Sequence, residues 1–279
     1  MGDEDITSIL KTGIAMFTAI IIVFSGMYLY SGLTKPLTVV ESGSMQHSET
    51  ESSIGVIDTG DIIVMISPEK KSLTSYVEGY ASGYREFGDY GDVIIYYRDY
   101  GNPVIHRAIV WLEYTNEGKW AAPTLANFDS DRWSDDNGIN KDYNDLKGTL
   151  TITGLGWRGY TASVDLDTLT RHSGYLTAGD NNEYFDQATG ISTCGLVDRG
   201  HIKAIAGLEI PWLGCVKLII NQKNVDKIPT NSIPCLVVSM IIIILVLVGI
   251  MAVTSHFVKM YDRKKRAMAE AKMNEREKE

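Results

Sequence analysis

The chain has 279 residues, of which 44% are hydrophobic and 22% are charged, a composition typical of a folded protein. The apolar residues are unevenly distributed, because residues 12–34 and 228–258 contain no Asp, Glu, Lys or Arg. Each segment is longer than the roughly 20 residues that cross the hydrocarbon core of a bilayer. The sequence therefore excludes a freely soluble protein and predicts transmembrane helices at 12–34 and 233–257.

The charged residues are also unevenly distributed. Residues 36–233 contain 27 Asp and Glu against 16 Lys and Arg, a net charge of −11, whereas residues 259–279 carry a net charge of +3. An acidic central domain would repel phosphate groups, so we expect no nucleic acid as a partner.

The orientation in the membrane follows from the cations beside the second apolar segment. The first segment is too long for the apolar region of a cleaved signal, and residues 28–33 offer no Ala-x-Ala exit, so we expect a retained anchor. Two lysines precede the second segment and five cations follow it: Lys259, Arg263, Lys264, Lys265 and Arg266. The positive-inside rule predicts a multi-pass protein of the cell membrane, with cytoplasmic tails at 1–11 and 258–279 and an extracytoplasmic domain at 35–232.

The central domain is predicted to be mostly β. Short runs rich in β-branched or aromatic residues are bounded by Gly, Asp, Asn or Pro, and no amphipathic helix of three turns separates them. The expected strands are 37–40, 61–66, 92–97, 104–111, 150–153, 174–178 and 202–206. We expect a mostly antiparallel fold, either a barrel or paired sheets. Residues 116–149 are rich in Asp, Asn and Gly and are expected to be exposed rather than part of a core.

Two local motifs suggest ligands but fit them poorly. Residues 154–159 match G-x-G-x-x-G, yet no helical period follows, so a loop with glycines at turn positions is the better interpretation. The acidic segment 129–136 lacks the first ligand of a calcium loop, because Trp133 occupies that position. No metal and no cofactor are expected. A disulfide between Cys194 and Cys215 stays open if the domain faces an oxidising space.

Residues suited to covalent chemistry occur at two places. In Ser42-Gly43-Ser44, the glycine permits a turn that exposes one hydroxyl beside free N–H groups, which suits a nucleophile, although such a turn is also common in loops. His106 shares a strand face with Val104, Ala108 and Val110, and is either a satisfied core histidine or a general base.

Two carboxylates form a third element in the segment 179–186. Asp180 and Asp186 lie six residues apart in a turn-rich stretch that follows the expected strand 174–178. One could fix the tautomer of a histidine while the other ties down the loop, or both could belong to an Asx-turn loop without catalytic duty.

The order of these motifs resembles type I signal peptidases, in particular the archaeal and endoplasmic-reticulum branch in which histidine replaces lysine. The resemblance lies in Ser-Gly-Ser-Met after a membrane span, two Gly-Asp strands, Ile-His-Arg, Gly-Asp-Asn-Asn with a later Asp, and Ile210-Pro-Trp-Leu-Gly214. It covers roughly residues 12–115 and 174–220. Relative to smaller members of the family, residues 116–171 form an insertion.

The resemblance implies a role for each matching residue. Ser44 would be the nucleophile, His106 the general base, and Asp186 the third member of the triad, with Asp180 as a supporting or alternative partner. Ser42 would help the backbone N–H of Ser44 to form the oxyanion hole. The implied activity is a serine endopeptidase that removes signal peptides after small residues, acting on secretory preproteins at the bilayer, with the protein-export channel as a candidate partner. The alternatives are a processing protease with another substrate and a non-catalytic adhesion or scaffold domain.

Overall fold

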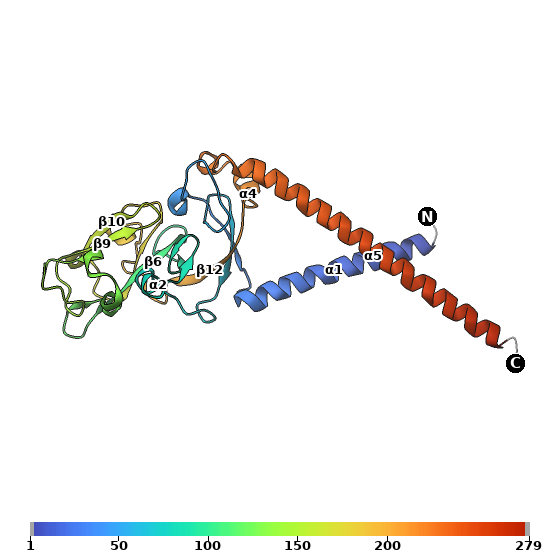
Figure 1. Ribbon diagram of the computed structural model, residues 1–279, viewed down its shortest axis with the longest axis horizontal. Helices are drawn as coiled ribbons and strands as arrows, with labels where there is room; N and C mark the ends of the chain where they lie inside the picture. Colours follow the sequence, from blue (N-terminus) through green and yellow to red (C-terminus); the bar gives the residue numbers. More distant parts are fainter. Residues whose placement is uncertain (1–2, 277–279) are drawn as a thin grey trace. The chain divides into compact units, whose positions relative to one another are not determined.

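The computed structural model describes residues 3–276, which divide into a helical unit within 1–27 and 237–279 and a domain spanning Tyr28–Leu236 (Figure 1). The helices of the first unit belong to α1 (Asp3–Ser31) and α5 (Ser232–Arg276). Their apolar stretches, Leu10–Ser31 with 22 residues and Ser232–Met268 with 37 residues, are long and apolar enough to cross a membrane.

The ends of both helices differ from the expected spans. α1 ends at Ser31, three residues before the predicted limit, because Gly32 takes a left-handed conformation with φ 72° and its N–H bonds the carbonyl of Tyr28 at 2.8 Å. This is a common way for glycine to end a helix. α5 continues beyond residue 257 into the basic tail, where residues 258–276 contain neither Gly nor Pro to interrupt it.

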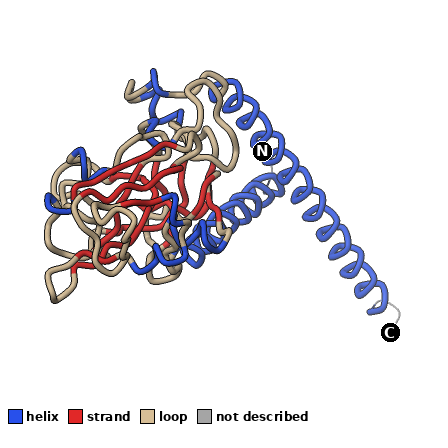
Figure 2. Tube along the Cα trace, turned by 60° about the vertical axis from the view of Figure 1, so that its left-hand side comes forward, coloured by secondary structure: helices blue, strands red, loops and turns tan. Residues whose placement is uncertain are grey.

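A seven-stranded antiparallel sheet forms the centre of the domain (Figure 2). Its order along the sheet is β1 (Leu37–Val39), β2 (Ile62–Ile66), β12 (Ile202–Ile210), β5 (Val93–Tyr96), β6 (Val104–Tyr114) and β11 (Gly174–Ala178), with β7 (Trp120–Ala121) paired to the end of β6. The predicted strands and their antiparallel pairing are confirmed. Within residues 3–276, β1 and β11 stay at opposite edges, so the sheet does not close into a barrel.

The remaining elements of the domain are short. A two-stranded ribbon joins β3 (Arg85–Glu86) and β4 (Asp89–Tyr90), and the helices are α2 (Tyr76–Ser82), α3 (Asp186–Thr189), α4 (Cys215–Ile220) and several single 3-10 turns. α2 begins at a capping box in which Ser75 and Glu78 satisfy each other's backbone N–H groups. None of these helices reaches three turns, as the sequence predicted.

A bulge in β6 corrects the predicted face of this strand. Val110 pairs with Leu176 and Ala108 with Thr177, which leaves Ile109 as an extra residue. Ala108 consequently packs in one hydrophobic cluster and Val110 in another. The expected alternation therefore fails between Ala108 and Val110, because a bulge reverses the side to which later side chains point.

The insertion builds part of the core, which corrects the expectation that residues 116–149 are merely exposed. β8 (Trp133–Ser134), β9 (Thr149–Leu155) and β10 (Tyr160–Asp165) form a second antiparallel sheet. Apolar side chains from the whole insertion share the largest hydrophobic cluster with α2 and β6; among them are Trp120, Leu125, Phe128, Trp133, Leu146, Leu150, Ile152, Leu155 and Val164. The Asp, Asn and Gly residues that dominate the composition occupy the turns between these side chains.

The glycine-rich motif 154–159 lies at the turn between β9 and β10. Gly154, Gly156 and Gly159 all have positive φ values, of 78°, 63° and 67°. A strand follows instead of a helix, so the predicted turn role is confirmed and the motif lacks the helix N-terminus that dinucleotide phosphates require.

Candidate active site

Ser44 lies on a single 3-10 turn, η1 (Gly43–Met45), which begins after the edge strand β1. The segment that follows β11 holds this turn in place from the other side. The backbone N–H of Asn181 donates to the Ser44 carbonyl at 2.8 Å, and its side-chain amide donates to the Gly43 carbonyl at 3.1 Å. Hydrogen bonds thus join two segments that are 137 residues apart in the sequence, directly beside the Ser44 hydroxyl.

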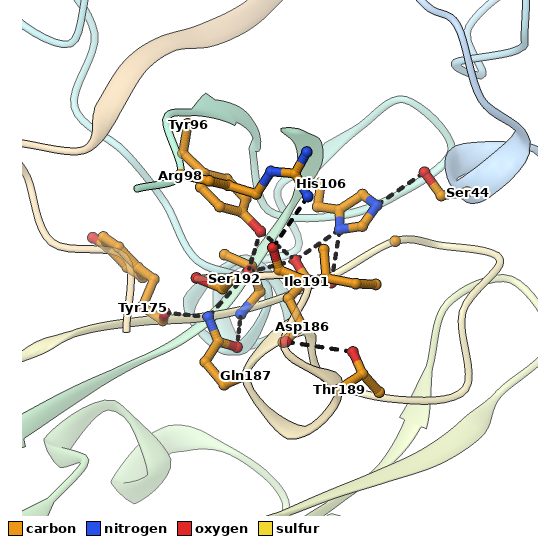
Figure 3. Close-up of polar contacts among 12 residues, drawn as sticks. Ser44, Tyr96, Arg98, His106, Tyr175, Asp186, Gln187, Thr189, Ile191 and Ser192 are labelled. Atoms are coloured by element: carbon orange, nitrogen blue, oxygen red, sulfur yellow. Dashed lines mark hydrogen bonds and ion pairs between the residues drawn. The ribbon is translucent and has the colours of Figure 1, made fainter. Parts of the chain in front are cut away.

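His106 reaches the same point from the central strand β6. Its imidazole is 3% exposed, and Nε2 lies 2.9 Å from Oγ of Ser44 (Figure 3). The structure therefore brings together two side chains that are 62 residues apart in sequence. The distance is within the range for proton transfer between a hydroxyl and an imidazole.

Asp186, the first residue of α3, lies on the opposite side of the His106 ring. Its carboxylate oxygens are 2.7 and 2.8 Å from Nδ1, and the carboxylate is fully buried (Figure 3). Oδ2 also accepts hydrogen bonds from the hydroxyls of Tyr96 at 2.8 Å and Thr177 at 2.6 Å. Because an ionised carboxylate only accepts, Nδ1 carries the proton and Nε2 presents its lone pair to Ser44.

Asp180, the alternative partner of the histidine, pairs with a different side chain. Arg107 donates to its two oxygens from Nε at 2.8 Å and Nη2 at 2.6 Å, and His47 Nε2 lies 3.3 Å away. Burial by itself would raise the pKa of Asp180, but the Arg107 charge and its hydrogen bonds lower the pKa below its ordinary value. Asp180 is thus an ionised member of a buried ion pair, and the structure places only Asp186 against His106.

Arg107 anchors the loops around this ion pair. It is 1% exposed, and its Nη1 donates to the carbonyls of Glu86, Tyr90 and Gly91 at distances of 2.7–3.1 Å. A planar guanidinium with five donors can satisfy a carboxylate and several carbonyls at once. The pair therefore fixes the segment that begins at Asp180 to the β3–β4 ribbon.

The packing at Gly179 is too close for any side chain. A Cβ at this position would lie 2.4 Å from the Ser44 carbonyl oxygen and 3.0 Å from Nε2 of His106. The phenol of Tyr160, on strand β10 of the insertion, donates to the Gly179 carbonyl at 2.6 Å. The insertion thus supports the segment that contacts both the candidate nucleophile and the candidate base.

Ser42 lies beside the candidate nucleophile, with its hydroxyl 3.2 Å from that of Ser44. The Ser44 N–H belongs to the first turn of η1, where N–H groups have no acceptor within the helix. A hydroxyl and an N–H at this point can both donate to an oxyanion.

A cleft of about 640 Å³ opens at Ser42, Ser44 and His106. β1 and residues 40–41 form one wall, residues 102–105 form another, and Ile95 lines it between them. The cleft is thus bordered by the free edge of the sheet.

Several side chains that complete the site were not predicted from the sequence. Tyr96 and Thr177 orient Asp186, but both belong to apolar strand patterns. A single hydroxyl in such a pattern does not indicate a role in a polar site. Arg107 was visible as the neighbour of His106, yet a charge in the middle of a strand was the only clue to its buried ion pair. Because a buried polar group needs a partner, a charge in the middle of an apolar strand indicates an acidic side chain elsewhere in the fold.

The cysteines and the acidic segment supply no metal ligands or disulfide in this structure. Cys194, Cys215 and Cys235 are free thiols. Asp135 accepts hydrogen bonds from Asn137 and from the backbone of Lys147, which makes it a turn-stabilising residue. Within residues 3–276, no group of three His, Cys, Asp or Glu side chains has the geometry of a metal site.

No protein-family model matches the chain, and no curated protein matches it. The functional assignment therefore depends on the order of the sequence motifs and on the geometry of Ser44, His106 and Asp186.

Proposed function

We propose that this chain is a membrane-anchored serine endopeptidase of the type I signal peptidase class, in the branch that uses Ser, His and Asp. The observation that carries the proposal is the continuous chain of contacts from Ser44 Oγ to His106 Nε2, and from His106 Nδ1 to Asp186. A nucleophile, a base and an orienting carboxylate in this arrangement are the minimal set for acyl transfer by a serine.

The proposed reaction has two stages. His106 Nε2 takes the proton of Ser44 while Oγ attacks the carbonyl carbon of the scissile peptide bond. The Ser44 N–H and the Ser42 hydroxyl donate to the resulting oxyanion. His106 then gives the proton to the leaving amine, the C–N bond breaks, and an ester on Ser44 remains. Water, deprotonated by His106, hydrolyses this ester and releases the acyl product.

The substrate would bind as an additional strand. β1 is an edge strand, and the chain runs from it directly to Ser42 and Ser44. An extended peptide can pair with such an edge through its backbone, while alternate side chains enter the cleft. Met45 and Ile95 line the cleft, and we expect these apolar side chains to favour small residues before the cut, as the resemblance implies.

The proposed location follows from the chain length between the first helix and the nucleophile. Ser44 is the thirteenth residue after Ser31, the end of α1, so a fully extended connection spans at most about 47 Å. We propose that both termini are cytoplasmic, by the positive-inside rule, and that the domain acts outside the membrane on preproteins whose apolar segment stays in the lipid.

Cleavage of a preprotein by the purified full-length protein in detergent tests this function. The wild type should make one cut after a small residue, identified by mass spectrometry of both products. Ser44→Ala should reduce the rate by about 10⁶-fold, to background. Ser53→Ala, which alters an exposed serine in the loop after η1, is the matched control and should retain full activity.

Two results would redirect the assignment. A wild type that leaves every preprotein intact would favour the anchored adhesion or scaffold domain. A wild type that cuts other membrane-tethered proteins but no preprotein would favour a processing protease with another substrate.

A further inference from the structure

Cations gather around the candidate active-site cleft, although the domain as a whole is acidic. Arg98, Lys203, Lys217 and Lys223 line the cleft, and Glu41 is the one acidic side chain among its lining residues. These five side chains carry a formal charge of +3, whereas residues 36–233 together carry −11. The positive charge is therefore concentrated at the place where a substrate would bind.

Lys217 and Lys223 share a single carboxylate. Their ammonium groups lie 3.0 and 2.5 Å from the two oxygens of Glu41. Both lysines are about half exposed, and together with Glu41 they leave one net positive charge on this wall of the cleft.

The other two cations have no carboxylate partner within residues 3–276. Arg98 donates from Nε to the Asn102 carbonyl at 2.9 Å, and Lys203 lies over the ring of Tyr97 with its ammonium 5.5 Å from the centroid. Neutral carbonyls and a ring hold these side chains in place but leave their charges uncompensated. Both are available to a carboxylate that enters the cleft.

We infer that the cleft selects for substrates that carry an acidic side chain within a few residues of the scissile bond. This inference rests on the proposed function, because it assumes that a peptide lies in the cleft. The cleft contains both Ser44 and His106, so a peptide that is cut would lie in the same cleft as these cations. An ion pair at a partly exposed site is worth up to about 1 kcal/mol, which corresponds to about a five-fold gain in kcat/KM for each well-placed carboxylate.

A lipid phosphate is the other anion that these cations could bind. The peptide is favoured because the cations line the same cleft as the nucleophile, whereas a lipid headgroup in this position would block the hydroxyl. The two sources can be separated by the composition of the bilayer.

The test uses the full-length protein in phosphatidylcholine vesicles and a set of preproteins that differ at one position. Asp, Asn or Lys is placed in turn at each of the five positions before and after the cut, and kcat/KM is measured at low and at high salt. At one position or more, Asp should exceed Asn by about five-fold and Asn should exceed Lys. High salt should reduce the difference, because it screens exposed charges.

Variants locate the effect in the cleft. In the double variant Arg98→Gln/Lys203→Gln, the ratio of kcat/KM for the Asp substrate to kcat/KM for the Asn substrate should fall from about five toward one. Lys119→Gln/Lys147→Gln removes the same charge from the insertion, outside the cleft lining, and should keep the preference. Lys203→Glu should shift the preference toward Lys at the position where Asp was best.

The outcomes separate this inference from the proposed function. Failure to cut any preprotein would remove the proposed function and the inference with it. Efficient cleavage with equal rates for Asp and Asn at every position would overturn the inference alone. Equal rates combined with inhibition by added phosphatidylglycerol would overturn it in favour of a lipid phosphate.

Discussion

The two aspartates of the segment 179–186 should respond differently to the same substitution. In Asp186→Asn, one carbonyl oxygen replaces two acceptor oxygens, while His106, Tyr96 and Thr177 still offer three donors. If the new amide group faces the imidazole, Nδ1 must accept and the proton moves to Nε2. The imidazole then cannot take the Ser44 proton, so we expect kcat to fall about 10⁴-fold. Stability should fall by only about 1–3 kcal/mol, the cost of one or two unsatisfied buried donors.

Asp180→Asn removes the charge that faces buried Arg107. The guanidinium would lose its ionised partner, and removal of one member of a buried ion pair costs about 3–5 kcal/mol. Because Asp180 does not contact His106, the activity of the molecules that remain folded should fall less than ten-fold. We thus expect Asp186→Asn to lower kcat without a large loss of stability, and Asp180→Asn to lower stability without a large loss of kcat.

Thermal unfolding and single-turnover cleavage, measured on the same detergent-solubilised preparations, separate the two effects. Asp131→Asn, at an exposed position in the insertion, serves as the control for the change of charge. The reasoning is wrong if Asp180→Asn abolishes turnover while its melting temperature is unchanged. It is equally wrong if Asp186→Asn retains more than one tenth of the wild-type kcat.

Two further substitutions test the packing of the site and a half-buried carboxyl. Gly179→Ala would force a methyl group against the Ser44 carbonyl and His106, so single-turnover cleavage should slow by about 100-fold or more; unchanged cleavage would contradict this packing. Burial raises the pKa of Glu209 from its ordinary value near 4.5 to about 7. Between these two pH values, the folded protein keeps a proton on Glu209 that the unfolded chain releases. The free energy of unfolding therefore falls as the pH rises through this interval. Glu209→Gln should therefore leave the melting temperature unchanged at pH 4.5 but stabilise the protein by about 1 kcal/mol at pH 8. Thermal melts at both pH values check this, with Glu113→Gln at an exposed position as the control.

The strand pattern was predictable because it is a local property. Segments such as 92–97 and 174–178 combine β-branched or aromatic residues with flanking turn residues, and neighbouring side chains decide most of that preference. The positions of helix ends and bulges were harder to predict from the sequence. Gly32 ends α1 through its own backbone conformation, and the bulge at Ile109 depends on the pairing with β11, a strand about 70 residues further along the chain.

The choice between two carboxylates shows where local reasoning stops. Asp180 and Asp186 lie six residues apart in the same turn-rich segment, and by sequence either could face the imidazole. The choice follows from Arg107. This buried cation needs an anion as its partner, and it pairs with Asp180. Once that pair is formed, the start of α3 turns Asp186 toward His106, and Tyr96 with Thr177 supplies the remaining donors.

The insertion extends the same argument to the core. Its composition predicted a solvated loop, because Asp, Asn and Gly outnumber the apolar residues between 129 and 148. What matters for burial is the face to which the few apolar side chains point, and Trp133 and Leu146 both enter the cluster shared with α2. The insertion then contacts the segment 179–186 through the hydrogen bond from Tyr160 to the Gly179 carbonyl. A segment outside the motifs that carry the family resemblance therefore supports the proposed site, and this support depends on tertiary contacts that no local pattern encodes.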